Sequence, residues 1–219
     1  MGIEISAQSV KELREKTSAG MMDCKKALQD SNGDMAKAIE TLRQKGLASA
    51  TKKTSRIATE GVVESYIHMG GKLGVIVEVN CETDFVARRP EFQELAKNIA
   101  MQIAASPSVE YINLQSIPSD VVEKEKETES SKEDIVKKPK EIKEKIVEGR
   151  IQKRLKEMTL LDQFFIRDSS ITIDELLRQN ISKLGENIQV RRFERFVLGE
   201  GLKKRQENFS EEVEKMIKK

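Results

Sequence analysis

The sequence is poor in the residues on which enzymes and metal sites most often depend. Its 219 residues include one histidine, two cysteines and no tryptophan. His68 sits at the end of a strand-like run beside a glycine turn, so we interpret it as a surface or strand-edge residue. Cys24 and Cys81 lie far apart in the chain and form neither a CxxC pair nor a zinc-binding pattern. We therefore expect no metal site, no cofactor and a reducing compartment.

The sequence also lacks long apolar runs, phosphate-binding glycine motifs and an excess of charge of either sign. No apolar stretch approaches the roughly 20 residues that span a bilayer, so we expect a soluble protein without a membrane segment. Neither a GxxxxGK[ST] loop nor a strand-linked GxGxxG occurs. Lysine and arginine number 39 against 37 aspartate and glutamate residues, a net charge of +2. Because proteins that grip a phosphate backbone usually carry a clear basic excess, direct nucleic-acid binding is not expected.

Apolar residues recur at helical spacing in three short segments between residues 6 and 46. Ser6 is a suitable N-cap for the first segment, and Gly46 is a suitable residue to end the third. The positions expected to face inward are Val10, Leu13, Cys24, Ala27, Leu28, Met35, Ala38, Ile39 and Leu42. We predict a three-helix bundle, a unit small enough to be a marginal folder and well suited to docking.

The periodicity changes after residues 49–57, "SATKKTSRI", which have no apolar period and are predicted to be a linker. The stretch "EGVVESYIHMGGKLGVIVEVNC" then holds two β-rich runs around Gly70 and Gly71, a pattern typical of a hairpin. Pro90 fits the first turn of a helix that continues to Ala105. The sequence therefore predicts a β-hairpin and a helix after the bundle.

The second half of the chain alternates charged and amphipathic segments. Residues 120–145 are rich in charge, and we predict two exposed helices that break at Lys138-Pro139, or a partly mobile segment, rather than a core element. An amphipathic helix resumes at "IVEGRIQKRLKEM", and another is predicted over 173–184. The stretch "NIQVRRFERFVLGEG" is predicted to be a strand, with Val190, Arg192, Glu194 and Phe196 on one face and Arg191, Phe193, Arg195 and Val197 on the other.

The stretch "EVNCETDFVARR" ends the second strand and places an acid and an aromatic side by side. On the residues alone, Thr83 or Asp84 caps the next helix and Phe85 packs the turn against the core. Alternatively, the turn projects Phe85 as an anchor, because a phenylalanine buries a large area with only two side-chain torsions. Glu82 and Asp84 could form a carboxylate pair, but nothing orients them toward one substrate.

Two of these stretches closely resemble the signatures of the elongation factor Ts family. They are "VKELREKTSAGMMDCKKAL" and "VEVNCETDFVAR", and the resemblance continues through "KEKIVEGRIQKRLKE", "LLDQFFIRD" and "GENIQVRRFERFVLGEG". It implies a ubiquitin-associated-like three-helix domain at 1–48, a linker at 49–57, an α+β core (dimerisation) domain with an antiparallel sheet at 58–201, and a C-terminal helical tail at 202–219.

The resemblance also implies an activity and a binding surface. Members of this family are guanine-nucleotide exchange factors for elongation factor Tu, which they bind in its GDP-bound and nucleotide-free forms. The residues implied beside the partner's magnesium site are Thr83, Asp84, Phe85 and Val86, and those implied on the N-terminal domain are Arg14, Met21 and Met22. Under this hypothesis the turn is a probe rather than a packing element, and no catalytic residue is needed.

Chain length bears on assembly. Long family members carry a duplicated core and a coiled-coil insertion, for which this chain is expected to have no room, and short members can pair two copies about a twofold axis. We therefore predict a homodimer with elongation factor Tu as its partner. The similarity to short cyanobacterial and plastid forms predicts a plastid stroma or a bacterial cytoplasm.

Two other functions remain as alternatives. A ribosome- or RNA-associated protein could use the arginines Arg88, Arg89, Arg191, Arg192 and Arg195, although acids and aromatics are interleaved with them. An enzyme built on Cys24 or Asp84 is the least favoured, because Cys24 lies on the inward face of a predicted helix and Asp84 lacks an oriented partner.

Overall fold

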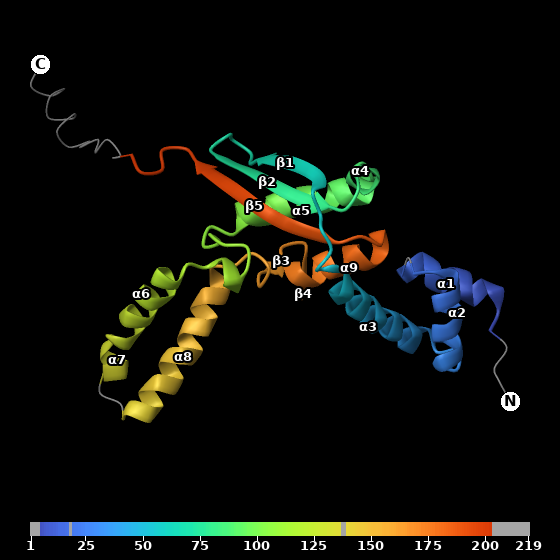
Figure 1. The fold of residues 1–219 in the computed structure, drawn as a ribbon, viewed down its shortest axis with the longest axis horizontal. Coiled ribbons are helices and arrows are strands. Elements are labelled where there is room, and N and C mark those ends of the chain that lie inside the picture. The colour runs from blue at the N-terminus through green and yellow to red at the C-terminus, as the bar shows by residue number, and fades with distance from the viewer. Residues whose placement is uncertain (1–4, 18, 137–138, 203–219) are drawn as a thin grey trace, which may run out of the picture.

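The computed structural model describes residues 5–17, 19–136 and 139–202, and its chain divides into a small helical bundle, a sheet-based core and a helical arm (Figure 1). The predicted α+β class, with a three-helix bundle before an antiparallel sheet, is confirmed. Apart from Leu202, the predicted C-terminal tail lies outside the described residues. No helix in the described ranges is both long and apolar enough to cross a bilayer.

The bundle consists of α1 (Ala7–Thr17), α2 (Met21–Asp30) and α3 (Met35–Lys53). Ser6 precedes α1 and caps it as predicted, with its Oγ accepting the Ser9 N–H at 3.1 Å. Asp34 does the same for α3, accepting the Lys37 N–H at 3.1 Å. The small core contains the inward residues that the periodicity predicted, namely Val10, Leu13, Cys24, Ala27, Leu28, Ala38 and Leu42.

The prediction that the third helix stops at Gly46 was wrong. Helix α3 continues to Lys53, through the first half of the predicted linker, and Ala50 is buried in the core of the next part of the chain. Gly46 has a different role, because α3 crosses α9 (Ile173–Leu184) there (Figure 1). A Cβ at Gly46 would lie 2.7 Å from Ser182 Oγ, so the absent side chain permits the close crossing.

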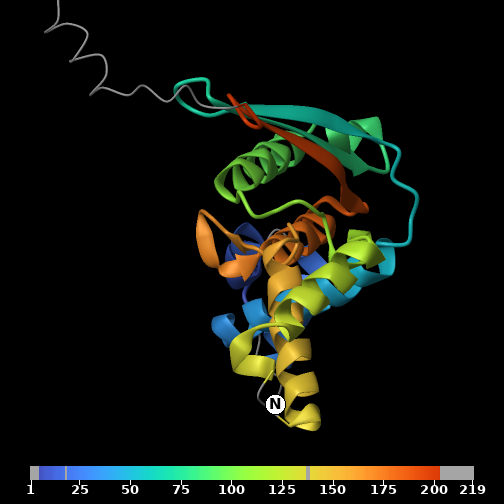
Figure 2. The same cartoon turned by 90° about the vertical axis from the view of Figure 1, so that its left-hand side faces the viewer.

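The sheet has the order β1-β2-β5, with all pairs antiparallel, and comprises β1 (Glu60–Ile67), β2 (Leu73–Cys81) and β5 (Ile188–Val197). The predicted hairpin at Gly70 and Gly71 is confirmed, and both glycines have a positive φ, 89° and 66°. Helix α5 (Pro90–Ala105), which begins at Pro90 as predicted, lies beneath one face of the sheet (Figure 2).

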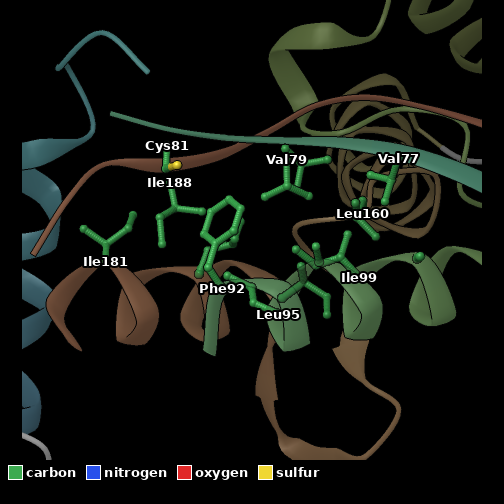
Figure 3. Packing of buried hydrophobic residues seen from close by; sticks show 14 of the residues in the cluster. Val77, Val79, Cys81, Phe92, Leu95, Ile99, Leu160, Ile181 and Ile188 are labelled. Carbon is green, nitrogen blue, oxygen red and sulfur yellow. The ribbon is translucent and has the colours of Figure 1, made fainter. Parts of the chain in front are cut away.

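The main core lies between this face and helices α5 and α9. Alternate residues of β2 are buried, and Val77 and Val79 point toward Leu95 and Ile99 of α5 (Figure 3). The opposite face of the sheet carries exposed apolar side chains, and no described helix lies over it (Figure 2). Those outward residues are Val63, Ile67, Ile76 and Phe196.

A β-bulge interrupts the simple alternation predicted for β5. Val79 pairs with Val190, but Glu78 pairs with Arg192, so Arg191 is an extra residue. Val190 is therefore buried, whereas Arg192, predicted on the same face, is exposed. The bulge also lets both arginines reach the Glu78 carboxylate, at 3.1 Å from Arg191 and 2.7 Å from Arg192.

The charged stretch forms an arm of two long helices, α6 (Ser119–Ser130) and α8 (Lys140–Glu157), with the four-residue α7 (Glu133–Val136) between them. The long helices are antiparallel, because Arg150 pairs with Glu129 and Arg154 with Glu125 (Figure 1). Ile135, Val147 and Ile151 give the arm a small core of its own. The predicted break in this stretch is found, since α7 ends at Val136 and α8 begins at Lys140.

The remaining elements are short, namely α4 (Asp84–Ala87), a 3₁₀ turn (Leu114–Ser116), β3 (Phe164–Phe165) and β4 (Asp168–Thr172). All but α4, which lies between β2 and α5, connect the arm to the core in sequence. Gln102 of α5 is buried and fastens the β3–β4 hairpin: its amide donates to the Phe164 carbonyl at 3.1 Å and its Oε1 accepts the Ile166 N–H at 2.8 Å.

Candidate protein-binding site at the end of strand β2

Strand β2 ends at a short turn that leads directly into the four-residue helix α4. Thr83 is the N-cap of α4, with extended backbone angles and with its Oγ1 accepting the Val86 N–H at 3.4 Å. Pro90 then begins α5, so α4 is held between the central strand and a long core helix. The prediction that Thr83 or Asp84 caps the next helix is confirmed for Thr83.

Phe85 projects from this corner into solvent. Its side chain is 80% exposed, whereas Val86 and Ala87 are each only 6% exposed and occupy the core-facing side of α4. The interpretation of Phe85 as a packing residue is therefore wrong. Asp84 lies beside Phe85 and forms an ion pair with Arg88 at 3.0 Å. Of the four residues predicted for partner contact, Phe85 is exposed, Thr83 and Asp84 are half-buried, and Val86 is buried.

The turn is held by residues that the sequence did not point to. The Glu186 carboxylate, in the loop between α9 and β5, accepts the Glu82 N–H at 3.1 Å, the Thr83 N–H at 3.0 Å and the Thr83 hydroxyl at 2.7 Å. In return, Glu82 Oε1 accepts the Asn187 N–H at 2.6 Å. These contacts join residues more than 100 positions apart, and no local pattern in the sequence predicts them.

The cysteines serve packing rather than thiol chemistry. Cys81 is buried, its Sγ lies 3.1 Å from the Thr83 carbonyl, and burial raises the pKa of its thiol to about 11. Because the reactive form of cysteine is the thiolate, Cys81 is neutral near pH 7. Cys24 is buried in the bundle core, as its position predicted. Among the described residues, no group of three or more histidine, cysteine, aspartate or glutamate side chains is placed to hold a metal ion.

A second candidate surface lies on the bundle. Met21 and Met22 begin α2 and are 45% and 77% exposed. Arg14 of α1 is exposed and borders a hollow of about 360 Å³ that Arg89, at the corner after α4, also lines. The remaining lining residues are Lys11, Glu15, Glu91 and Lys183. The hollow therefore lies between Arg14 of the bundle and Arg89, which begins the turn into α5.

The arginines considered for RNA binding are engaged within the chain. Arg191 and Arg192 bind Glu78, and Arg195 donates to the carbonyls of Ser106 and Pro107 at 2.9 and 2.7 Å. The other two, Arg88 and Arg89, pair with Asp84 and Glu91. Hydrogen bonds from Arg192, and then from Arg191, hold the pKa of the Glu78 carboxyl below its ordinary value, against the opposing effect of partial burial. These acids offset the positive charge that a phosphate backbone would need.

Comparison with known proteins gives one consistent result. Residues 3–200 match the family described as Elongation factor TS. A chloroplastic elongation factor Ts from Guillardia theta is 73% identical over 219 residues, covering all of both chains. The elongation factor Ts of Rippkaea orientalis is 66% identical over 210 residues, which are 96% of this chain and 84% of that protein. A chloroplastic elongation factor Ts from Porphyra purpurea is 62% identical over the full length of both chains. The family match includes the bundle surface and the turn that bears Phe85.

Proposed function

The chain belongs to the elongation factor Ts family of translation elongation factors, and we propose that it promotes release of GDP from elongation factor Tu. The observation that carries the proposal is the exposed Phe85, beside Asp84 on a short helix that Thr83 caps. This side chain is 80% exposed in the free chain. A partner that covers it removes apolar surface from water, which lowers the free energy of the complex.

In the proposed mechanism, Thr83, Asp84 and Phe85 enter the nucleotide domain of elongation factor Tu beside its Mg²⁺ site. Phe85 wedges between helices there and displaces the segment that holds the metal and the phosphates. Asp84 brings a negative charge near the ion, whose own charge dominates such a site. Val86 takes part indirectly, because its buried side chain fixes the turn to the core.

One phenylalanine is insufficient for this task. A 10⁴-fold weakening of GDP binding requires about 5.5 kcal/mol of differential affinity, whereas burying one phenylalanine contributes about 1.5–3 kcal/mol. The bundle supplies the further contacts in this proposal, through Arg14, Met21 and Met22. Exposed methionines suit this role because their flexible, polarisable side chains adapt to a partner surface.

The proposed activity involves no covalent chemistry, so the chain is a binding factor rather than an enzyme. It binds nucleotide-free elongation factor Tu more tightly than the nucleotide-bound form. Because the coupling is reciprocal, GTP that binds elongation factor Tu weakens the hold of the factor by the same ratio and displaces it. The cycle then leaves elongation factor Tu in its GTP form.

The assembly and location are part of the same proposal. We propose a homodimer, supported by the exposed apolar face of the three-stranded sheet, because such a face is often covered by another protein surface. The names of relatives from Guillardia theta and Porphyra purpurea describe them as chloroplastic. A plastid stroma, or a bacterial cytoplasm, is the proposed location.

The test is release of a fluorescent GDP analogue from elongation factor Tu. The native chain is expected to accelerate release strongly, and Phe85→Ala to lose most of the acceleration while its thermal unfolding is unchanged, since Phe85 is exposed. Met69→Ala, which shortens an apolar side chain exposed at the other end of β2, should behave as the native chain. Absence of acceleration by the native chain, together with steeply salt-dependent RNA binding, would support the RNA-associated alternative instead.

A further inference from the structure

We propose that Glu186 is a positioning residue for nucleotide exchange, which fixes the orientation of Asp84 and Phe85 through the turn at Glu82 and Thr83. The inference rests on the proposed function and adds to it a residue outside both candidate binding surfaces. Glu186 is half-buried in the loop between α9 and β5, and its contacts bring it to the base of the turn rather than to its tip.

Glu186 supplies hydrogen-bond acceptors to the backbone just beyond the end of the sheet. The last pair between β2 and β5 is Cys81 with Ile188, so the ladder supplies no strand partner for the N–H groups of Glu82 and Thr83. Both groups donate instead to Glu186 Oε2, at 3.1 and 3.0 Å. A carboxylate that accepts two consecutive backbone N–H groups fixes the direction of that backbone, because charge-assisted hydrogen bonds are short and strong.

Glu186 also sets the direction of the Thr83 hydroxyl. A threonine hydroxyl has one proton to donate, and here it donates that proton to Glu186 Oε1 at 2.7 Å. Its lone pairs are then free to accept the Val86 N–H, the bond that caps α4. Glu186 therefore determines where α4 begins and in which direction Phe85 projects.

Hydrogen bonds run in both directions between the turn and the loop before β5, which restrains both segments. Glu82 Oε1 accepts the Asn187 N–H at 2.6 Å, and the buried Asn187 side chain donates to the carbonyls of Thr54 and Arg56 at 3.3 and 2.7 Å. The turn, the loop before β5 and the segment after α3 thus hold one another. Because α3 belongs to the bundle, the same contacts relate the Phe85 corner to the bundle surface.

The test uses Glu186→Gln in the full-length chain. Glutamine keeps one acceptor oxygen, so at least one of the three hydrogen bonds is lost. At saturating concentrations of the chain, the maximal rate of GDP-analogue release is expected to fall about tenfold or more, while the half-saturating concentration changes much less. Glu200→Gln, the same change at the far end of β5, should leave both quantities as in the native chain.

Two further readouts separate positioning from a merely structural role. Backbone amides of Glu82 and Thr83 should exchange hydrogen faster in Glu186→Gln, without loss of the overall fold. In a double-mutant cycle, Glu186→Gln should add little to the defect of Phe85→Ala, because Glu186 acts through Phe85. Glu186→Asp retains the carboxylate, is expected to be intermediate, and provides the same comparison if the glutamine variant does not fold.

Unchanged maximal release in folded Glu186→Gln, or full additivity with Phe85→Ala, would overturn the inference while leaving the proposed function intact. Failure of the native chain to accelerate release would instead overturn the proposed function, and the inference with it.

Discussion

Glu78 shows how one bulge changes the chemistry of single residues. Arg191 and Arg192 both bind the carboxylate of Glu78, whose side chain is only 14% exposed, and they lower its pKa. A pKa lowered in the folded state means that the charged form stabilises the fold. That stability is present above the ordinary glutamate pKa of about 4.3 and is lost as the pH falls through the lower folded pKa.

We therefore expect Glu78→Gln to make the free energy of unfolding less dependent on pH in acid. Between about pH 5 and pH 3 the native chain should lose more of its free energy of unfolding than the variant does. Urea titrations at several pH values measure the difference. Glu123→Gln, which removes an exposed carboxylate from α6, serves as the control. Curves for the native chain and Glu78→Gln that stay parallel down to pH 3 would contradict this account.

The buried thiol of Cys81 gives a second prediction for a single residue. With a pKa of about 11, roughly one thiol in a thousand is ionised at pH 8, and the side chain is also inaccessible. Iodoacetamide at pH 8 should leave Cys81 unmodified in the native chain and modify it after unfolding in guanidinium, as read by mass spectrometry. Rapid alkylation without unfolding would show that the end of β2 opens readily.

At the scale of secondary-structure elements, α3 connects the bundle to the core by crossing α9 at Gly46. An exposed helical glycine replaced by alanine usually gains about 0.5–1 kcal/mol. Gly149 of α8 has open space around it, so Gly149→Ala should show that gain. At Gly46 the new Cβ would lie 2.7 Å from Ser182 Oγ and 3.3 Å from its Cβ, so Gly46→Ala should show none or be destabilising. Urea unfolding followed by circular dichroism compares the two variants, and equal stabilisation would contradict the close crossing.

The same elements show what periodicity can predict. Helix α9 matches its predicted bounds, and α5 begins at Pro90, because an apolar stripe with clear capping residues is a local signal. The end of α3 was missed because Gly46 is a typical helix terminator, and only the partner helix shows why a glycine is needed within the helix. The bulge in β5 was missed for the same reason, since register depends on the neighbouring strand.

The candidate site, too, could be predicted from the sequence only in part. The sequence around the turn predicts Thr83 as a cap and leaves two roles for Phe85, packing residue or anchor. Burial decides between these roles: Val86 and Ala87 occupy the core-facing side of α4, so Phe85 is exposed. The support from Glu186 and Asn187 could not be predicted, because a loop acid reveals no partner 104 positions away.

At the scale of the whole molecule, the uncovered sheet face makes the proposed dimer testable. Ile76 lies on the central strand, points outward and is 47% exposed. If two copies pair through this face, Ile76→Lys places a charge in the interface and should convert a dimer into a folded monomer, as measured by light scattering at micromolar concentration. Met69→Lys, at the hairpin turn, is the control. A native chain with the mass of a monomer would exclude the dimer.

In the proposed mechanism, Phe85 weakens the binding of GDP and does not only contact the partner's surface. The most direct test of this mechanism is the ratio of two affinities of the chain, for nucleotide-free and for GDP-bound elongation factor Tu, since this ratio is the coupling itself. We predict a large ratio for the native chain and for Met69→Ala, and a ratio lowered by about tenfold or more in Phe85→Ala. Equal weakening of both affinities by Phe85→Ala would contradict the account, because Phe85 would then be an anchor without influence on GDP.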